Sequence, residues 1–145
     1  MRVVIDTNIW ISGLLWQGMS WELLRLAEKR QVVLCITPLM LDEINEVLRY
    51  DRLQPRLEQV ELTPSELVAY VMSLAAMFEV QVPEEEPIVI VDPDDDIFLH
   101  CAIVAGATYI VSGDRHLLDL GKYAGIPILT IRDFLTQEFP ALVID

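Results

Sequence analysis

The stretch Arg2-Val3-Val4-Ile5-Asp6-Thr7-Asn8 decides the fold of this chain of 145 residues. Its apolar residues are mostly β-branched and follow one another without interruption, as in a strand that is buried on both faces of a parallel sheet. The strand then stops at the carboxylate of Asp6. Because ligands of open α/β sheets bind beyond the carboxyl ends of the strands, Asp6 is predicted to lie at a functional edge.

The composition predicts one soluble domain over residues 1–145. Hydrophobic residues make up 53% of the chain, which is enough for a sizeable core. No apolar run reaches the ~20 residues needed to cross a bilayer, and the N-terminus has no signal-peptide pattern. We therefore expect a cytoplasmic protein that does not associate with membranes. Its two cysteines, Cys35 and Cys101, are expected to be reduced and buried.

The net charge of −13 argues against a generic nucleic-acid-binding surface, because phosphate binding usually needs a basic face. A divalent cation held by acidic residues would supply a positive field instead, and a basic partner protein would also suit this charge. The densest basic stretch contains Arg49, Arg52 and Arg56. These side chains could contact phosphates or acidic groups of a partner, or simply face solvent.

Strands and helices alternate along the chain, which implies right-handed βαβ units, a mainly parallel sheet and an α/β fold. Further buried strands are predicted at 32–36, 108–111 and 127–130, with a short one at 80–82. Longer helices are predicted at 21–30, 38–50, 64–77, 93–106 and 131–138, capped where applicable by Ser20, Thr37, Thr63 and Asp92. Residues 9–18 are expected to form a short helix or turn and then a loop, and 51–61 an irregular segment or short helix.

Four carboxylates occupy comparable positions in this pattern. Asp6 and Asp114 each end a buried strand. Glu43 lies on the core side of one helix, and Asp95 lies in the first turn of another. In a parallel sheet all four converge on the carboxyl edge, where they would repel one another without a cation. Mg²⁺ or Mn²⁺ takes oxygen ligands, keeps waters open to substrate and promotes attack on a phosphodiester.

Two short polar residues stand beside these carboxylates. Asn8 follows Asp6 by two positions, and Ser112 precedes Asp114 by two. Both are predicted to orient metal ligands or the attacking water.

These motifs together resemble a PIN domain, and more narrowly the prokaryotic PIN proteins of the VapC type that are assigned as toxins of toxin–antitoxin pairs. The similarity covers about residues 2–135 and rests on Val3-Val4-Ile5-Asp6-Thr7-Asn8, Glu43, Asp92-Pro93-Asp94-Asp95 before Phe98-Leu99, and Val111-Ser112-Gly113-Asp114. The resemblance implies a three-layer α/β/α sandwich, a single-strand-specific endoribonuclease, a homodimer and an inhibitory antitoxin. It also implies an Mg²⁺ or Mn²⁺ site formed by Asp6, Glu43, Asp95 and Asp114.

Three adjacent aspartates compete for the third position of this site. In the family, the helix's acidic residue precedes the small-residue break that ends the helix by a fairly constant interval, which selects Asp95. Helix geometry agrees, because Asp95 lies four positions before Leu99. Asp96 shares a side with His100 and is expected to face outward, although it also shares a side with Leu99. Asp94 is expected only to favour the helix N-terminus.

Simpler explanations exist for each motif taken alone. Asp6 could end a strand in a turn, and the aspartates at 92–96 could serve only as a helix N-terminus. Glu43 is harder to explain in this way, because a carboxylate on an apolar helix face needs a partner. The four carboxylates taken together favour the metal site.

The histidines and tryptophans were weighed in the same way. His100 and His116 have no motif around them and are interpreted as a helix-surface and a loop residue. Trp10, Trp16 and Trp21 could stack on bases, but their spacing and apolar neighbours favour the core or a dimer interface.

The leading hypothesis is a metal-dependent endoribonuclease that acts on single-stranded or structured RNA. The alternative is a non-catalytic PIN-like module that binds RNA or a protein. A third class is a phosphatase of the haloacid-dehalogenase kind. Such enzymes usually carry a second aspartate two residues after the strand-end aspartate, and this chain has Asn8 there.

Overall fold

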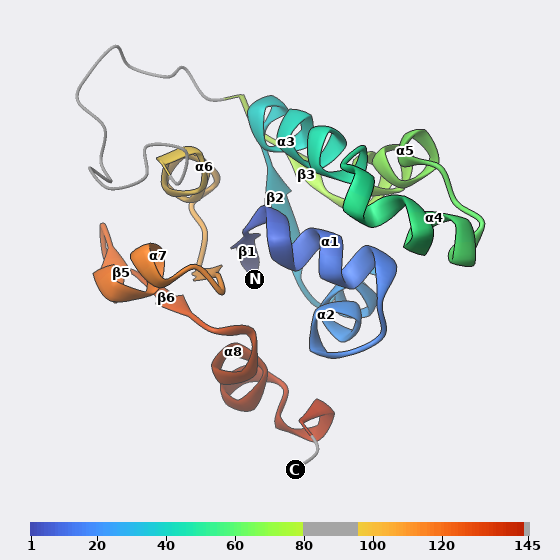
Figure 1. Cartoon of the computed structure of the whole chain (residues 1–145). Coiled ribbons are helices and arrows are strands. Elements are labelled where there is room, and N and C mark those ends of the chain that lie inside the picture. Colours follow the sequence, from blue (N-terminus) through green and yellow to red (C-terminus); the bar gives the residue numbers. More distant parts are fainter. Residues whose placement is uncertain (80–95, 144–145) are drawn as a thin grey trace.

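A computed structural model describes residues 1–79 and 96–143 (Figure 1). Within these residues, six strands form a sheet in the order β3-β2-β1-β4-β6-β5. They are β1 (Arg2–Ile5), β2 (Val33–Ile36), β3 (Ala76–Met77), β4 (Tyr109–Val111), β5 (Lys122–Tyr123) and β6 (Ile126–Leu129). Neighbouring strands pair in parallel except β5 and β6, which are antiparallel. The predicted α/β fold with a mainly parallel sheet is therefore confirmed.

Helices flank this sheet. They are α1 (Thr7–Leu15), α2 (Met19–Glu28), α3 (Pro38–Leu48), α4 (Gln54–Val60), α5 (Pro64–Leu74), α6 (Asp96–Ala105), α7 (Arg115–Leu120) and α8 (Ile131–Glu138), with 3₁₀ turns η1 (Asp51–Leu53) and η3 (Pro140–Leu142). Helix α6 packs on β1, β2 and β4, while α1 packs on α2, α3 and α4. None of the helices in the described ranges is long and apolar enough to cross a membrane.

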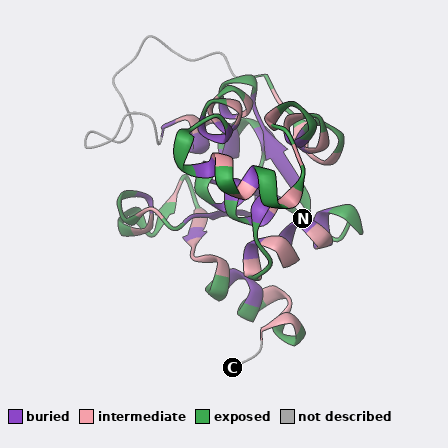
Figure 2. Cartoon of the chain, turned by 45° about the vertical axis from the view of Figure 1, so that its right-hand side comes forward, coloured by how far each residue is buried: buried purple, intermediate pink, exposed green. Residues whose placement is uncertain are grey.

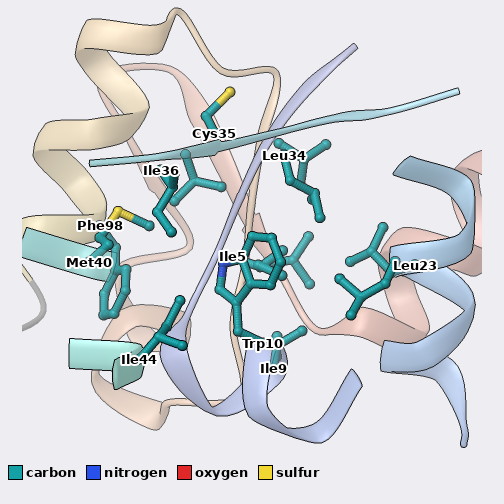
Figure 3. Close-up of a cluster of buried hydrophobic side chains, with 14 of the residues drawn as sticks. Ile5, Ile9, Trp10, Leu23, Leu34, Cys35, Ile36, Met40, Ile44 and Phe98 are labelled. Atoms are coloured by element: carbon teal, nitrogen blue, oxygen red, sulfur yellow. The ribbon is translucent and has the colours of Figure 1, made fainter. Parts of the chain in front are cut away.

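The core lies on both faces of the sheet. In Figure 3, Leu34 and Ile36 project from β2 toward Trp10 of α1, whereas Cys35 projects to the opposite side. This alternation is the period of two that a strand buried on both faces requires. Trp10 and Ile5 are completely buried, and Figure 2 shows buried residues gathered on the strands and on the inner sides of the surrounding helices. Both cysteines are buried and free, as expected.

Helix α1 is longer than the sequence predicted. It begins at Thr7, directly after Asp6, and runs for nine residues where a short helix or turn was expected. The structure describes every residue of α1, and only Asn8 and Ser12 among them are exposed. A helix that is apolar almost all round lacks the amphipathic period that marks a surface helix, so its length could not be read from the pattern.

Gly13 explains how α1 and α2 approach each other so closely. A Cβ at this position would lie 2.8 Å from the backbone oxygen of Ser20 and 2.9 Å from Cδ1 of Leu24. Gly13 therefore lies inside the helix and permits close packing.

The predicted caps have mixed outcomes. Thr37 caps α3, and Thr63 forms a capping box with Glu66 on α5, both as predicted. The prediction for Ser20 is wrong: α2 begins at Met19 after Gly18, and Ser20 is buried within its first turn. The predicted cap at Asp92, the helix start at 93 and the strand at 80–82 lie outside the described residues.

Two other boundaries differ from the predicted ones. Helix α5 ends at Leu74, and Ala76–Met77 then pairs with β2 as β3 instead of continuing the helix to 77. The last parallel strand has an antiparallel partner, β5, that was not predicted. Residues 51–61 form η1 and α4, in agreement with the expected short helix.

Candidate metal centre

Asp6 stands where β1 ends and α1 begins, and its carboxylate is held on both oxygens. Oδ1 accepts a 2.8 Å hydrogen bond from the backbone N–H of Ile9, which caps α1. Oδ2 accepts hydrogen bonds from Oγ of Ser112 at 2.7 Å and from the backbone N–H of Gly113 at 3.0 Å. The residue is only 5% exposed. Three donors from two segments therefore fix the orientation of this carboxylate.

Ser112 connects the ends of β1 and β4. It is fully buried, and its Oγ both donates to Asp6 and accepts a 2.9 Å hydrogen bond from the backbone N–H of Asp114. Its own backbone N–H donates to the carbonyl of Leu129 in β6 at 3.0 Å. Ser112 thus lies next to Asp6 and Asp114, where the sequence predicted an orienting residue.

Asp114 follows β4 and caps α7. Its Oδ1 accepts a 2.7 Å hydrogen bond from the backbone N–H of His116. In the part of the chain that the structure describes, its Oδ2 accepts no hydrogen bond. A carboxylate has about four lone-pair sites, so Asp6 and Asp114 each retain acceptor capacity for a cation.

The two carboxylates open into one cleft of about 590 Å³. It is lined by Asp6, Asn8, Ile9, Ser12, Ser20, Gly113, Asp114, Arg115 and His116. Carboxylate and amide oxygens are ligands that Mg²⁺ accepts, and Mg²⁺ is usually held by one or two carboxylates with water in the other positions. The side-chain oxygens of Asp6, Asn8 and Asp114 are therefore of the kind that Mg²⁺ takes as ligands.

Four polar residues of this cleft were not predicted from the sequence as site residues: Ser12, Ser20, Arg115 and His116. Arg115 and His116 are exposed in the first turn of α7 and bring a cation and an imidazole to the carboxylates. His116, interpreted as a loop residue, is therefore on a helix at the cleft. The sequence signal that could have placed His116 at the site is its position two residues after Asp114.

The other predicted ligands are not placed in this cleft. Glu43 is half-buried on α3, which packs against α1 and α6, and it does not line the cleft. Asp94 and Asp95 lie outside the described residues. Over residues 1–79 and 96–143, no three of the His, Cys, Asp and Glu side chains are grouped closely enough to hold a metal ion.

The prediction that Asp96 faces outward is wrong. Asp96 begins α6 and is only 7% exposed. Five other residues of α6 are buried, whereas Ile103 and Val104 in its last turn are 47% and 48% exposed. The burial of Asp96 matches that of Leu99, which is completely buried, and differs from that of His100, which is half-buried.

Comparisons with known proteins agree with this architecture. Residues 2–116 match the family model described as PIN domain. An uncharacterized protein, MJ1680 of Methanocaldococcus jannaschii, is 27% identical over 143 residues, which span 96% of this chain and 89% of that protein.

Two solved structures share the fold. The structure of PAE2754 from Pyrobaculum aerophilum has a TM-score of 0.64 at 17% identity and covers 94% of this chain and 88% of its own. VapBC2 from Rickettsia felis, bound to a DNA fragment from the promoter, has a TM-score of 0.56 at 14% identity, covering 89% of this chain and 97% of its own. The family is shown by the match over residues 2–116, which covers most of the chain: the chain belongs to the PIN domain family.

Proposed function

We propose that this protein is an Mg²⁺- or Mn²⁺-dependent endoribonuclease that cleaves single-stranded RNA. The observation that carries the proposal is the placement of Asp6 and Asp114 in one cleft at the carboxyl edge of a parallel sheet, joined through Ser112. Two carboxylates beside each other are costly unless a cation offsets their repulsion. Divalent-metal nucleases use such an arrangement.

In this proposal Asp6 and Asp114 hold the ion, with Glu43 and Asp95 as the further acidic residues that the family resemblance implies. A bound Mg²⁺ or Mn²⁺ would lower the pKa of a water nucleophile and stabilise negative charge on the phosphodiester oxygens. The donors around Asp6 keep its carboxylate pointing into the cleft without reorganisation. Asn8 would orient a ligand or water from the first turn of α1.

The net charge of −13 is unfavourable for binding RNA, and a basic side chain beside the cleft offsets it locally. Arg115 lines the cleft next to Asp114, so a phosphate entering there meets a guanidinium as well as the ion. Arginine binds phosphate oxygens through a planar fork of donors. His116 adds a group that can donate a hydrogen bond to the substrate.

We further propose that the protein is the toxin of a toxin–antitoxin pair, is a homodimer and acts in the cytoplasm. The fold shared with VapBC2 supports this placement, and the acidic surface would suit a partner protein with basic segments. A small reading frame beside this gene that encodes a DNA-binding protein would be the expected antitoxin.

One observation favours the alternative of a non-catalytic module that binds RNA or a protein. The three hydrogen bonds accepted by Asp6 cap α1 and tie β1 to the segment after β4, which is a structural role complete in itself. In that case the protein would bind RNA without cutting it, and Asp114 could be replaced without effect.

Cleavage of labelled single-stranded RNA, with Mg²⁺ or Mn²⁺ and with the protein free of any inhibitor, separates these functions. The informative variant is Asp114→Asn, because asparagine caps a helix as well as aspartate does and removes only the charge. Asp119→Asn is the matched control, since Asp119 is exposed on the same helix and does not line the cleft. We expect wild type and the control to cleave, and Asp114→Asn to lose at least about 100-fold in rate. Equal rates in all three proteins, or none in any, would reject the nuclease.

A further inference from the structure

The exposed side of α1 leads away from the cleft. Asn8 and Ser12 line the cleft. Trp16 follows at the same interval of four residues as the cap just beyond Leu15, and its backbone N–H still donates to the carbonyl of Ser12. Residues four apart lie on one face of a helix, so Asn8, Ser12 and Trp16 form a single row, called here the α1 stripe. At 1.5 Å per residue, Trp16 lies about 12 Å along the axis from Asn8.

Trp16 differs from the other tryptophans in being open to solvent. It is 43% exposed, whereas Trp10 is completely buried. The guanidinium of Arg56, on α4, lies 5.5 Å from the centroid of the Trp16 ring. Arg56 is itself held in place, because Nε donates to the backbone oxygen of Leu15 at 2.7 Å and a terminal nitrogen donates to Gln59 at 3.2 Å. The pair is therefore a pre-arranged indole with a cation over one of its faces.

The charge around this pair suits a polyanion. Residues 49–56 contain three of the ten lysines and arginines of the chain, with Asp51 as the one acidic residue among them. Arg52 lies 5.5 Å from the ring centroid of Tyr50, which is also exposed. On a chain with a net charge of −13, such a concentration of arginine beside exposed aromatic rings is the pattern of a surface that binds single-stranded nucleic acid.

From this arrangement we infer that Trp16 and Arg56 form a stacking platform for a base of single-stranded RNA. The base stacks on the indole while the arginines of 49–56 meet the phosphates, and the α1 stripe leads the strand to the carboxylate cleft. Trp16 is thus a positioning residue, which holds the substrate about two helical turns from Asn8 and does not touch the reacting phosphate. The inference rests on the proposed nuclease function and assigns its substrate contacts.

A second tryptophan provides a matched control. Trp21 is half-buried, and the guanidinium of Arg25 lies 4.8 Å from its ring centroid. This pair lines a different pocket, between α1, α2 and α5. It has the same chemistry as the platform and is not on the α1 stripe.

The test measures binding of a labelled oligouridylate by fluorescence anisotropy, with all variants in an Asp114→Asn background so that RNA is not cut. Trp16→Ala is expected to raise the Kd by about 5- to 100-fold, the range for loss of one base–aromatic stack. Trp21→Ala is expected to change it by less than about twofold, because this ring does not meet the strand. In the Asp114→Asn parent, RNA should also quench tryptophan fluorescence, and adding Trp16→Phe should remove that quenching while preserving an aromatic face.

Each contrary outcome is distinct. If the parent protein binds RNA and Trp16→Ala binds equally well, the platform is wrong and the nuclease proposal stands. If the parent neither binds RNA nor, with Asp114 restored, cleaves it, both proposals fail. If Trp16→Ala leaves RNA binding intact and instead changes the sedimentation coefficient, Trp16 is a contact between copies of the chain and the platform is rejected.

Discussion

Oγ of Ser112 donates a 2.7 Å hydrogen bond to Oδ2 of Asp6 and accepts a 2.9 Å hydrogen bond from the backbone N–H of Asp114. A single buried hydroxyl therefore sets the positions of both carboxylates of the cleft. The parallel pairing of β1 with β4 brings these residues together. The site is thus a property of the sheet edge, and its stability and its chemistry are coupled.

Asp6→Asn is expected to keep the fold but lower the free energy of unfolding by about 1–3 kcal/mol, the cost of leaving a buried donor unpaired. Asparagine can still accept from Ile9, but its NH₂ group would then face the N–H of Gly113. Relief of repulsion between the carboxylates would act in the opposite direction and stabilise the variant. Urea unfolding of the two proteins decides, and an increase in stability would show that repulsion outweighs the hydrogen bonds.

Ser112→Ala is predicted to lower the free energy of unfolding by about 2–3 kcal/mol, because it removes a hydrogen bond to a carboxylate and leaves the N–H of Asp114 unpaired. Ser73→Ala is the control. Ser73 also donates a 2.7 Å hydrogen bond, to the backbone of Tyr70, but it is exposed on α5. Its replacement should change stability by less than about 0.5 kcal/mol, since alanine is a good helix former. Equal losses of stability in urea unfolding of the two variants would mean that the buried hydrogen bonds of Ser112 stabilise the fold no more than the exposed one of Ser73.

Gly13→Ala should destabilise by about 1–3 kcal/mol, the usual cost of overpacking. The added methyl would meet the backbone oxygen of Ser20 at 2.8 Å, an atom that cannot rotate away. Gly18→Ala is the comparison, because a Cβ there has no neighbour within 4 Å, and its cost should stay below about 1 kcal/mol. Thermal unfolding of both variants tests this; a Gly13→Ala protein as stable as wild type would show that α1 and α2 can separate freely.

The raised pKa of Tyr70 predicts that the stability of the fold decreases at alkaline pH. Burial raises the pKa of Tyr70 to about 12, and the hydrogen bond that it donates to Glu28 acts in the same direction. The unfolded chain loses this proton near the ordinary tyrosine pKa of about 10, so it binds fewer protons than the folded protein between pH 10 and 12. Stability from this group is complete below about pH 10 and is lost as the pH rises through about 12.

The corresponding measurement is urea unfolding as a function of pH for wild type and Tyr70→Phe. Phenylalanine has no proton to lose, so the difference in stability between the two proteins should shrink above pH 10. A constant difference across this range would contradict the raised pKa of Tyr70.

Much of the fold was readable from the sequence because its signals are local. The apolar run ending at Asp6 and the threonine caps at Thr37 and Thr63 each depend on neighbouring residues, and the structure has them as predicted. The predictions that were wrong concern features that depend on tertiary contacts. Ser20 resembles a cap by type, but α2 already begins at Met19, and the backbone oxygen of Ser20 packs against Gly13 of α1.

Short elements and uniformly apolar elements could not be predicted from the periodicity of hydrophobic residues. Strands β3 and β5 have two residues each, too few to show any period, and they exist because a neighbouring strand offers its edge. Helix α6 is apolar on most sides, so the orientation of Asp96 at its start could not be judged from spacing. At the site, the strand-end carboxylates could be found from position in the chain, whereas the cleft residues Ser12 and Ser20 depend on how α1 meets α2.

The central claim is that Asp6 and Asp114 together bind one divalent cation. Binding of Mn²⁺, followed by its electron paramagnetic resonance signal and displaced by Mg²⁺, tests this without reference to any RNA. We predict one saturable site in wild type and in Asp119→Asn, and at least about tenfold weaker binding in Asp114→Asn, the loss expected when one of few carboxylate ligands is neutralised. Unchanged Mn²⁺ affinity in a folded Asp114→Asn protein would contradict the claim.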